Sequence, residues 1–224
     1  MSDYIAHTET ANGYRLDIIQ DSDAESPRSA YEEAATMVCE HRRYNLGDDD
    51  GREKAIAAVR SSRDYRDSWE DYENPNMLDL SEPNQLWEAI QRCSDIVSNP
   101  LYLYDHSGIT ISMGRFSCAW DSGQVGFIFM TKAQILDCYM KPATARLTPA
   151  LKAKALELME GETKTYDSYL TGDVYGYTIT KLDSDEEQDD SCWGFYGLEY
   201  AIEEGQSILA HYAAIEPQLE LEPA

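Results

Sequence analysis

The chain has 224 residues, with 42 Asp and Glu against 18 Lys and Arg, and a formal net charge of −24. Such a charge disfavours direct binding to nucleic acid or to acidic membranes and favours basic protein partners. No apolar run reaches the length of about 18 residues that a membrane span needs, and the start of the chain does not resemble a signal peptide. We therefore expect a cytoplasmic protein with enough chain for one large domain or two small ones.

The first hundred residues predict one strand and three helices. Alternating polar and apolar residues indicate a strand over residues 14–19. Helical spacing of apolar residues predicts helices over 29–41, from 52 to about 69, and over 84–98. Gly47 is expected to end the first helix, with Arg42 and Arg43 near its last turn, where cations interact favourably with the helix dipole.

The middle of the chain holds the best strand candidates. Residues 101–104, 109–112 and 125–130 are rich in β-branched and aromatic side chains. The turn sequence DHSG separates the first two runs, and DSG precedes the third. These features predict an antiparallel meander over residues 101–130. The segment 83–147, which contains the meander, has no net charge.

The last third predicts two helices, a hairpin and a final helix. Thr131 is expected to cap a short helix over 131–139, and Pro149 to occupy the first position of a longer one over 148–170. Strands over 174–182 and 192–196 would form a hairpin, followed by a helix over 199–214 and a frayed tail from 216. The whole pattern predicts a single α+β domain over 1–224, with a mostly antiparallel sheet (meander 101–130 plus hairpin 174–196) flanked by helices.

The charge is unevenly distributed along the chain. Residues 1–82 carry a net charge of −11, residues 83–147 carry 0 and residues 148–224 carry −13. Acidic surface commonly serves solubility alone, but carboxylates repeated along helices also approximate the charge density of DNA phosphates. Under the second interpretation, the residues expected to bind a basic partner are Asp64, Asp67, Glu70, Asp71, Asp185, Glu186, Glu187, Asp189 and Asp190.

The cysteine and histidine pattern gives only weak signals for metal or cofactor binding. The five cysteines are scattered, as expected of reduced thiols in a cytosolic protein. Cys39 and His41 form a C-x-H pair that His106, Cys118 or Cys192 would have to complete, and no C-x-x-C or H-x-x-x-H spacing is present. We expect no bound metal and no cofactor.

An enzymatic alternative rests on the turns of the central region. Asp105 and His106 in one turn, with Cys118, Trp120 and Asp121 in the next connection, have the residue types of a thiol hydrolase or a nucleotide-processing pocket. The simpler interpretation is that polar residues are common in tight turns and that free cysteines pack well in cores. The enzymatic hypothesis requires these side chains to converge.

Several strings resemble a family of uncharacterised proteins common in bacteriophages and other bacterial mobile elements. They are DSDAESPR from residue 21, TMVCEHRRYNLGD from 36, PLYLYDHSGITIS from 100, FSCAWDSGQVGFIF from 116, YLTGDVYGY from 169 and DSCWGFYG from 190. The family has no established activity, so the resemblance implies a context and assigns no residue a role. That context is an intracellular protein made during infection or carried on a mobile element.

Charge and resemblance together predict an inhibitor. We expect the protein to bind a basic, nucleic-acid-binding surface of a host defence complex, as an anti-CRISPR or anti-restriction protein and a possible DNA mimic. The alternatives are an enzyme that uses the Asp105, His106, Cys118 and Asp121 turns, and a structural or regulatory phage protein without catalysis.

Overall fold

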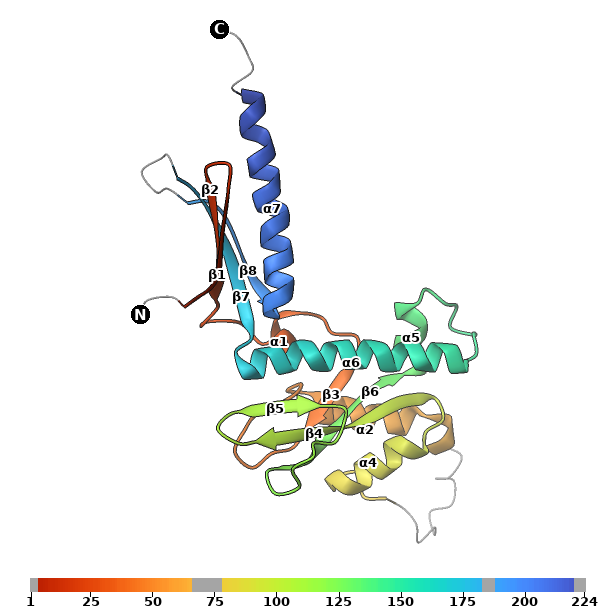
Figure 1. Ribbon diagram of the computed structural model, residues 1–224. Coiled ribbons are helices and arrows are strands. Elements are labelled where there is room, and N and C mark those ends of the chain that lie inside the picture. The colour runs from red at the N-terminus through yellow and green to blue at the C-terminus, as the bar shows by residue number, and fades with distance from the viewer. Residues whose placement is uncertain (1–3, 66–77, 183–187, 220–224) are drawn as a thin grey trace. The chain divides into compact units, whose positions relative to one another are not determined.

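Eight β-strands within the described part of the chain pair into two antiparallel sheets of four strands each (Figure 1). The computed structural model describes residues 4–65, 78–182 and 188–219. Residue contacts divide the chain into two compact units, here called the terminal unit (Met1–Ser26 with Ser168–Ala224) and the central unit (Pro27–Asp167). Each unit contains one sheet and helices that pack on it, so the α+β class with antiparallel pairing is confirmed.

The terminal unit is one sheet with a long helix on one face. Its strands are β1 (Ile5–Ala11), β2 (Tyr14–Gln20), β7 (Val174–Lys181) and β8 (Gln188–Tyr196), in the order β1-β2-β7-β8, and helix α7 is Leu198–Leu219. The inward side chains of β2 and β7, including Leu16 and Ile179, form a buried cluster with Ala201 and Leu209 of α7. Gly205 lets the helix approach closely, since a Cβ there would lie 2.8 Å from Leu16 Cδ1.

The central unit is a second sheet in the order β3-β6-β4-β5. Its strands are β3 (Thr36–Cys39), β4 (Ile96–Asp105), β5 (Ile109–Ser112) and β6 (Ser122–Thr131), and its helices are α1 (Pro27–Ala30), α2 (Gly51–Ser61), α4 (Pro83–Arg92), α5 (Lys132–Cys138) and α6 (Pro149–Thr171), which runs on into the terminal unit. Helices α2 and α4 pack on one face through a cluster that includes Val59, Leu86, Phe127 and Phe129. Strand alternation turns Ile128 and Met130 to the other face, where they are also fully buried.

The three central strands form as predicted, but their order differs from a simple meander. Strand β4 pairs antiparallel with both β5 and β6, so β4 lies between them. The predicted hairpin 174–196 also forms, as β7 with β8, but it does not extend the central sheet. Strand β7 pairs instead with β2, and the register places apolar side chains of both strands on the same face of the sheet. The expectation that strand 174–182 joins the meander was therefore wrong.

The predicted helix over 29–41 is also wrong. Helix α1 ends at Ala30, and Thr36–Cys39 is strand β3, which pairs with β6 from Phe129 to Gly126. Met37 and Val38 are both buried there, one on each face of the sheet. Arg42 and Arg43 consequently follow a strand and lie in a loop. The helix over 84–98 ends at Arg92, because residues 96–98 begin β4, and strand β1 was not predicted at all.

The helices of the second half follow their sequence signals. Thr131 caps α5 in a capping box, in which its side chain accepts from Gln134 N and the Gln134 side chain accepts from Thr131 N. Pro149 is the first residue of α6, and α7 begins at Leu198, one residue before the predicted start. Its predicted end at 214 and the frayed tail from 216 were wrong, because α7 continues to Leu219. Capping residues mark these boundaries because they satisfy the free N–H groups of the first turn.

A buried ionic cluster holds the central unit together around Arg28, whose side chain is 2% exposed. Its guanidinium donates to both oxygens of Asp48 (2.7 and 3.0 Å), to Glu162 Oε2 (2.9 Å) and to the Ala35 carbonyl (2.7 Å). The second oxygen of Glu162 accepts from the backbone N–H groups of Ala34 and Ala35, and Asp48 accepts from Met37 N. Burial alone would lower the pKa of Arg28, but the hydrogen bonds and charges of Asp48 and Glu162 raise it.

Substitution at Gly126 tests the close approach of β3 to β6. A Cβ at Gly126 would lie 1.9 Å from the Val38 carbonyl oxygen, a backbone atom that cannot move aside alone. We expect Gly126→Ala to lower the free energy of unfolding by at least about 2 kcal/mol, as overpacking does. Gly161→Ala is the matched control, because a Cβ there meets nothing within 4 Å and alanine favours the helix by about 0.5–1 kcal/mol. Urea unfolding of both variants measures the two effects, and equal stabilities would contradict the register.

Candidate functional site

Negative charge is concentrated in the terminal unit. This unit contains 19 Asp and Glu and only two basic residues, Arg15 and Lys181, whereas the central unit contains 23 acidic and 16 basic residues. Arg15 is already paired with Asp17 (2.9 Å), and Lys181 lies over the Tyr14 ring. The carboxylates of the terminal unit therefore have few internal cations to neutralise them.

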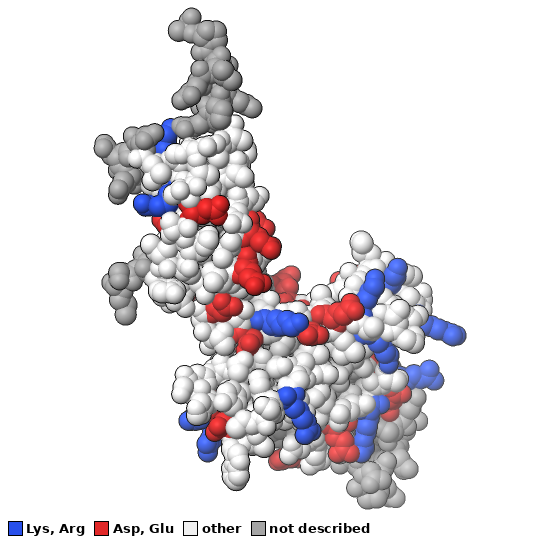
Figure 2. Space-filling view, viewed as in Figure 1, with Lys and Arg blue, Asp and Glu red and all other residues white. Residues whose placement is uncertain are grey.

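Helix α7 carries part of this charge on its surface. Glu199 and Glu203 are exposed and four residues apart, so they lie on the same side of the helix. Figure 2 shows acidic side chains gathered along the half of α7 that begins at Leu198. Sequence reasoning placed the acidic contact surface at residues 64–71 and in the 183–190 turn and did not include α7, although the spacing of its glutamates could have identified it.

Only two of the nine acidic residues predicted for partner binding have described side chains. Asp64 is exposed and accepts a hydrogen bond from Ser94 N (2.6 Å), and its hydrogen bonds with Ser94 lower its pKa. Asp190 is half-buried in β8, opposite Ile179. The two lie in different units. Asp67, Glu70, Asp71, Asp185, Glu186 and Glu187 lie outside the described residues, as does the side chain of Asp189.

The turn residues of the enzymatic hypothesis do converge in part. Asp121 Oδ2 lies 3.6 Å from His106 Nδ1 and 3.5 Å from Cys118 Sγ. The backbone holds these residues close together, because Asp105 N donates to the Asp121 carbonyl (2.8 Å) where β4 ends beside the start of β6. Trp120 is 97% exposed and takes no part in the cluster.

The geometry around Cys118 does not match that of an activated thiol. The carboxylate of Asp121 is the group in contact with Sγ, whereas a reactive thiolate is stabilised by a neighbouring cation. Asp105 is directed elsewhere, with its carboxylate paired to Arg43 and accepting from the Tyr44 hydroxyl (3.3 Å). Asp121 is therefore placed to orient His106 and Cys118, and no contact joins His106 to Cys118 among the described residues.

A second cluster, formed by the loop after β3, was not predicted. The rings of His41 and Tyr44 stack with centroids 4.9 Å apart and planes at 9°. Arg43 lies over the same Tyr44 ring and pairs with Asp105. These residues belong to the string HRRY. Because this string was expected at the end of a helix, the cluster was not recognised from the sequence.

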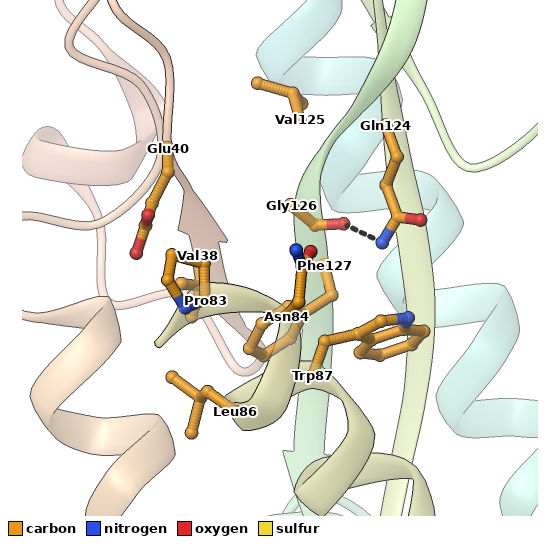
Figure 3. Close-up of a pocket in the computed structure, with 10 residues that line it drawn as sticks. All are labelled: Val38, Glu40, Pro83, Asn84, Leu86, Trp87, Gln124, Val125, Gly126 and Phe127. Atoms are coloured by element: carbon orange, nitrogen blue, oxygen red, sulfur yellow. Dashed lines mark hydrogen bonds between the residues drawn. The ribbon is translucent and has the colours of Figure 1, made fainter. Parts of the chain in front are cut away.

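A small pocket opens between the first turn of α4 and strands β3 and β6 (Figure 3). It has a volume of about 250 Å³ and a floor of apolar side chains, in which Trp87 stacks on Phe127 with centroids 5.1 Å apart. Figure 3 shows the amides of Asn84 and Gln124 beside Gly126, whose carbonyl accepts from Gln124 Nε2 (3.2 Å). Glu40 at the rim is paired with Arg52. The pocket is smaller than most sites for drug-sized ligands, which begin at about 300 Å³.

The metal hypothesis finds no support around Cys39. Burial, with a contribution from Asp48, raises the pKa of the Cys39 thiol to about 12. Within residues 4–65, 78–182 and 188–219, no three His, Cys, Asp or Glu side chains are grouped to hold a metal ion.

Glu33 is a carboxyl group that titrates near neutral pH. Burial raises its pKa to about 7, and the charge of Glu162 and a hydrogen bond with it act in the same direction, against the opposing charge of Arg28. Groups of this kind occur in active sites, but they also occur in structural ion networks. Since Glu162 belongs to the Arg28 cluster, we interpret Glu33 as a proton-holding neighbour of that cluster.

The Glu33 pKa predicts how stability depends on pH. In the unfolded chain Glu33 ionises near its ordinary value of 4.5, so between about pH 4.5 and 7 the folded state binds more protons. This contribution to stability therefore falls as the pH rises through that window. Glu33→Gln, which imitates the protonated acid, should stabilise the protein at pH 8 and change little at pH 4.5. Urea midpoints across the pH range measure this, with the exposed Glu32→Gln as control; a Glu33→Gln profile parallel to wild type would contradict the assignment.

The five thiols should react at different rates. All five cysteines are unpaired, with Cys138 and Cys192 exposed and Cys93 buried, where its Sγ donates to the Ala89 carbonyl (3.3 Å). Burial raises the pKa of Cys93 as well as that of Cys39. We expect Cys192 to be labelled first in the native protein, Cys39 last, and five thiols to titrate after denaturation without reductant. Mass spectrometry of timed alkylation checks the order, and early labelling of Cys39 would show that its environment differs.

Comparison with known proteins supplied no relative. No protein-family model matches the chain, and no curated protein or solved structure is similar to it. None of the helices among the described residues is long and apolar enough to cross a membrane. Function is therefore inferred from charge, contacts and geometry.

Proposed function

We propose that this protein binds a basic, nucleic-acid-binding surface of a protein complex in a bacterial host and blocks nucleic acid from it. One observation carries the proposal: the terminal unit has 19 acidic and two basic residues, and the side chain of Arg15 is already engaged within the unit. A protein surface with an excess of acidic side chains attracts basic protein and repels nucleic acid and acidic membranes. The proposed partner is therefore a protein.

The form of the terminal unit supports mimicry of a phosphate array. Helix α7 spans 22 residues, and a helix rises about 1.5 Å per residue, so α7 presents a rigid edge of about 33 Å. Along it Glu199 and Glu203 repeat at one helical turn. DNA carries a charge about every 1.7 Å of its axis, so α7 alone is sparser, and the neighbouring carboxylates of the unit must contribute.

The context of the proposal comes from the sequence strings that resemble mobile-element proteins. Mobile elements benefit from disabling restriction and CRISPR complexes, whose nucleic-acid channels are lined with basic residues. A defence complex of this kind is thus the proposed target. Solubility alone remains the competing explanation of the charge, and it predicts no specific partner.

Salt and charge substitutions separate these explanations. Each exposed ion pair contributes only about 0.2–1 kcal/mol, so many must act together, and screening beyond about 8 Å weakens them at physiological ionic strength. We expect the full chain to capture a nucleic-acid-binding complex from bacterial lysate at low salt, to release it at high salt, and to compete with DNA or RNA for it.

Matched triple variants locate the binding surface. Neutralising Asp190, Glu199 and Glu203 of the terminal unit should slow association by about fivefold or more, because complementary charge acts mainly on the association rate. Neutralising three exposed carboxylates of the central unit, Asp49, Glu53 and Glu157, changes the net charge equally and should have a smaller effect. Surface plasmon resonance against the captured complex measures both rates. Equal effects, or no salt-sensitive partner, would favour the solubility explanation.

A hydrolytic function is the second candidate, because His106 and Cys118 both contact Asp121. In this alternative Asp121 would hold the imidazole for acid–base chemistry on a small ester or nucleotide. Turnover of p-nitrophenyl esters or nucleotides that is lost in Asp121→Asn and in Cys118→Ala, with the fold retained, would support it. Absence of turnover at any pH between 5 and 9 would remove this candidate.

A further inference from the structure

The segment between residues 132 and 154 reverses the charge of the rest of the chain. It contains Lys132, Lys141, Arg146, Lys152 and Lys154, and Asp137 is its one acidic residue. Figure 2 shows basic side chains gathered around α5 and the adjoining end of α6. A local excess of cations in a protein of net charge −24 calls for a physical explanation.

The cations of this segment differ in their contacts from most other described Lys and Arg side chains. Ion pairs with carboxylates hold at least seven of the twelve described basic side chains outside the segment: Arg15, Arg28, Arg43, Arg52, Lys54, Arg92 and Lys164. Within residues 132–154 no such pair occurs among the described residues. Lys152 donates to the Ser94 carbonyl (3.2 Å), and Lys154 lies over the Tyr139 ring. Lys132 and Lys141 therefore keep their charge available to a ligand.

These two lysines line the same cavity. The cavity has a volume of about 540 Å³, within the range of about 300–1,000 Å³ typical of small-molecule sites. Its apolar lining includes Ile96 and Leu136, and its polar lining includes Asp95 and Asp137 as well as the lysines. Asp95 Oδ1 accepts from Ser62 Oγ (2.6 Å), which fixes that carboxylate at the wall.

The backbone holds Lys141 at this cavity in a strained turn. Met140, just before it, has a φ of 49° and is 93% exposed, although side chains other than glycine rarely adopt that conformation. The turn lets Lys141 N donate to the Leu136 carbonyl (2.7 Å), so the chain returns over the end of α5. The left-handed residue and this hydrogen bond are those of a helix C-cap, which fixes where Lys141 leaves the end of α5.

We propose that this cavity binds the phosphate monoester of a small polyhydroxylated molecule, such as a sugar phosphate or a nucleoside monophosphate. The ammonium groups of Lys132 and Lys141 bind the phosphate, and the carboxylates of Asp95 and Asp137 accept hydrogen bonds from hydroxyl or amino groups of the ligand. A nucleic acid would bring several phosphates near these two carboxylates, whereas a monoester brings one, so the carboxylates disfavour a continuous polyanion. The site lies in the central unit, away from the His106, Cys118 and Asp121 cluster in sequence and in its lining residues.

Three probes test the proposal by thermal shift and calorimetry on the full chain. Inorganic phosphate, ribose 5-phosphate and AMP should each raise the melting temperature with saturation, the two esters more strongly than phosphate. Lys132→Met and Lys141→Met should each weaken ester binding by about tenfold or more, since each removes a charged hydrogen bond. Lys164→Met is the matched control, because Lys164 pairs with Glu160 and does not line the cavity.

Two further variants separate the roles of the lining. Asp137→Asn should reduce the preference for ribose 5-phosphate over inorganic phosphate, because only the ester carries sugar hydroxyl groups that can donate to this carboxylate. Met140→Gly should raise the melting temperature of the unliganded protein, because glycine adopts a positive φ without strain. The proposal is overturned if none of the three probes saturates, or if Lys164→Met weakens binding as much as Lys132→Met. It is equally overturned if a 12-base-pair DNA duplex binds more tightly than AMP. In that case the five cations of the segment would act together on nucleic acid.

Discussion

The central unit depends on the charge of Arg28 being fully satisfied away from water. An isolated buried guanidinium would cost many kcal/mol. Here two carboxylates and the Ala35 carbonyl accept its hydrogen bonds. The carboxylates in turn accept the backbone N–H groups of Ala34, Ala35 and Met37, where the chain enters β3. Removing one partner of such a cluster typically costs about 3–5 kcal/mol, because an uncompensated charge stays behind. The cluster thus fixes the path of the chain from α1 into β3 more tightly than apolar packing alone would.

The same cluster explains why a helix-like sequence becomes a strand. Residues 29–35 contain good helix formers, and propensity favours continuing the helix through Val38. Asp48 accepts from Met37 N and Glu162 accepts from Ala35 N, so these donors are satisfied outside any helix. Thr36–Cys39 then pairs with β6, where Gly126 allows the backbones to approach. Tertiary contacts from residue 162 decide the structure of residues 34–37, and no local pattern contains that information.

Local signals succeeded where the structure is itself local. Thr131 and Pro149 marked helix starts because capping is settled within one turn, and the strands around residues 101–130 followed their β-branched runs. The assignment of strands to sheets failed because β7 satisfies the same alternation rule in either sheet. Strand β1 was missed because its outer positions, such as Thr8 and Thr10, are polar and its inner Glu9 is held by Gln206 of α7. Among candidate functional residues, the enzymatic hypothesis required His106, Cys118 and Asp121 to lie close together. The cavity beside Lys132 and Lys141 could be found only from the fold.

Net charge is a poor guide to what this protein binds at any one place. Exposed charges are screened beyond about 8 Å at physiological ionic strength, so each surface acts through its own composition. The terminal unit has two basic residues, and one of them, Arg15, pairs with the buried Asp17. The central unit instead pairs eight of its described carboxylates with basic or histidine side chains, and it retains one region where cations exceed anions. A chain of charge −24 can therefore present an acidic surface to a basic protein in one unit and a lysine-lined cavity to a small phosphate in the other.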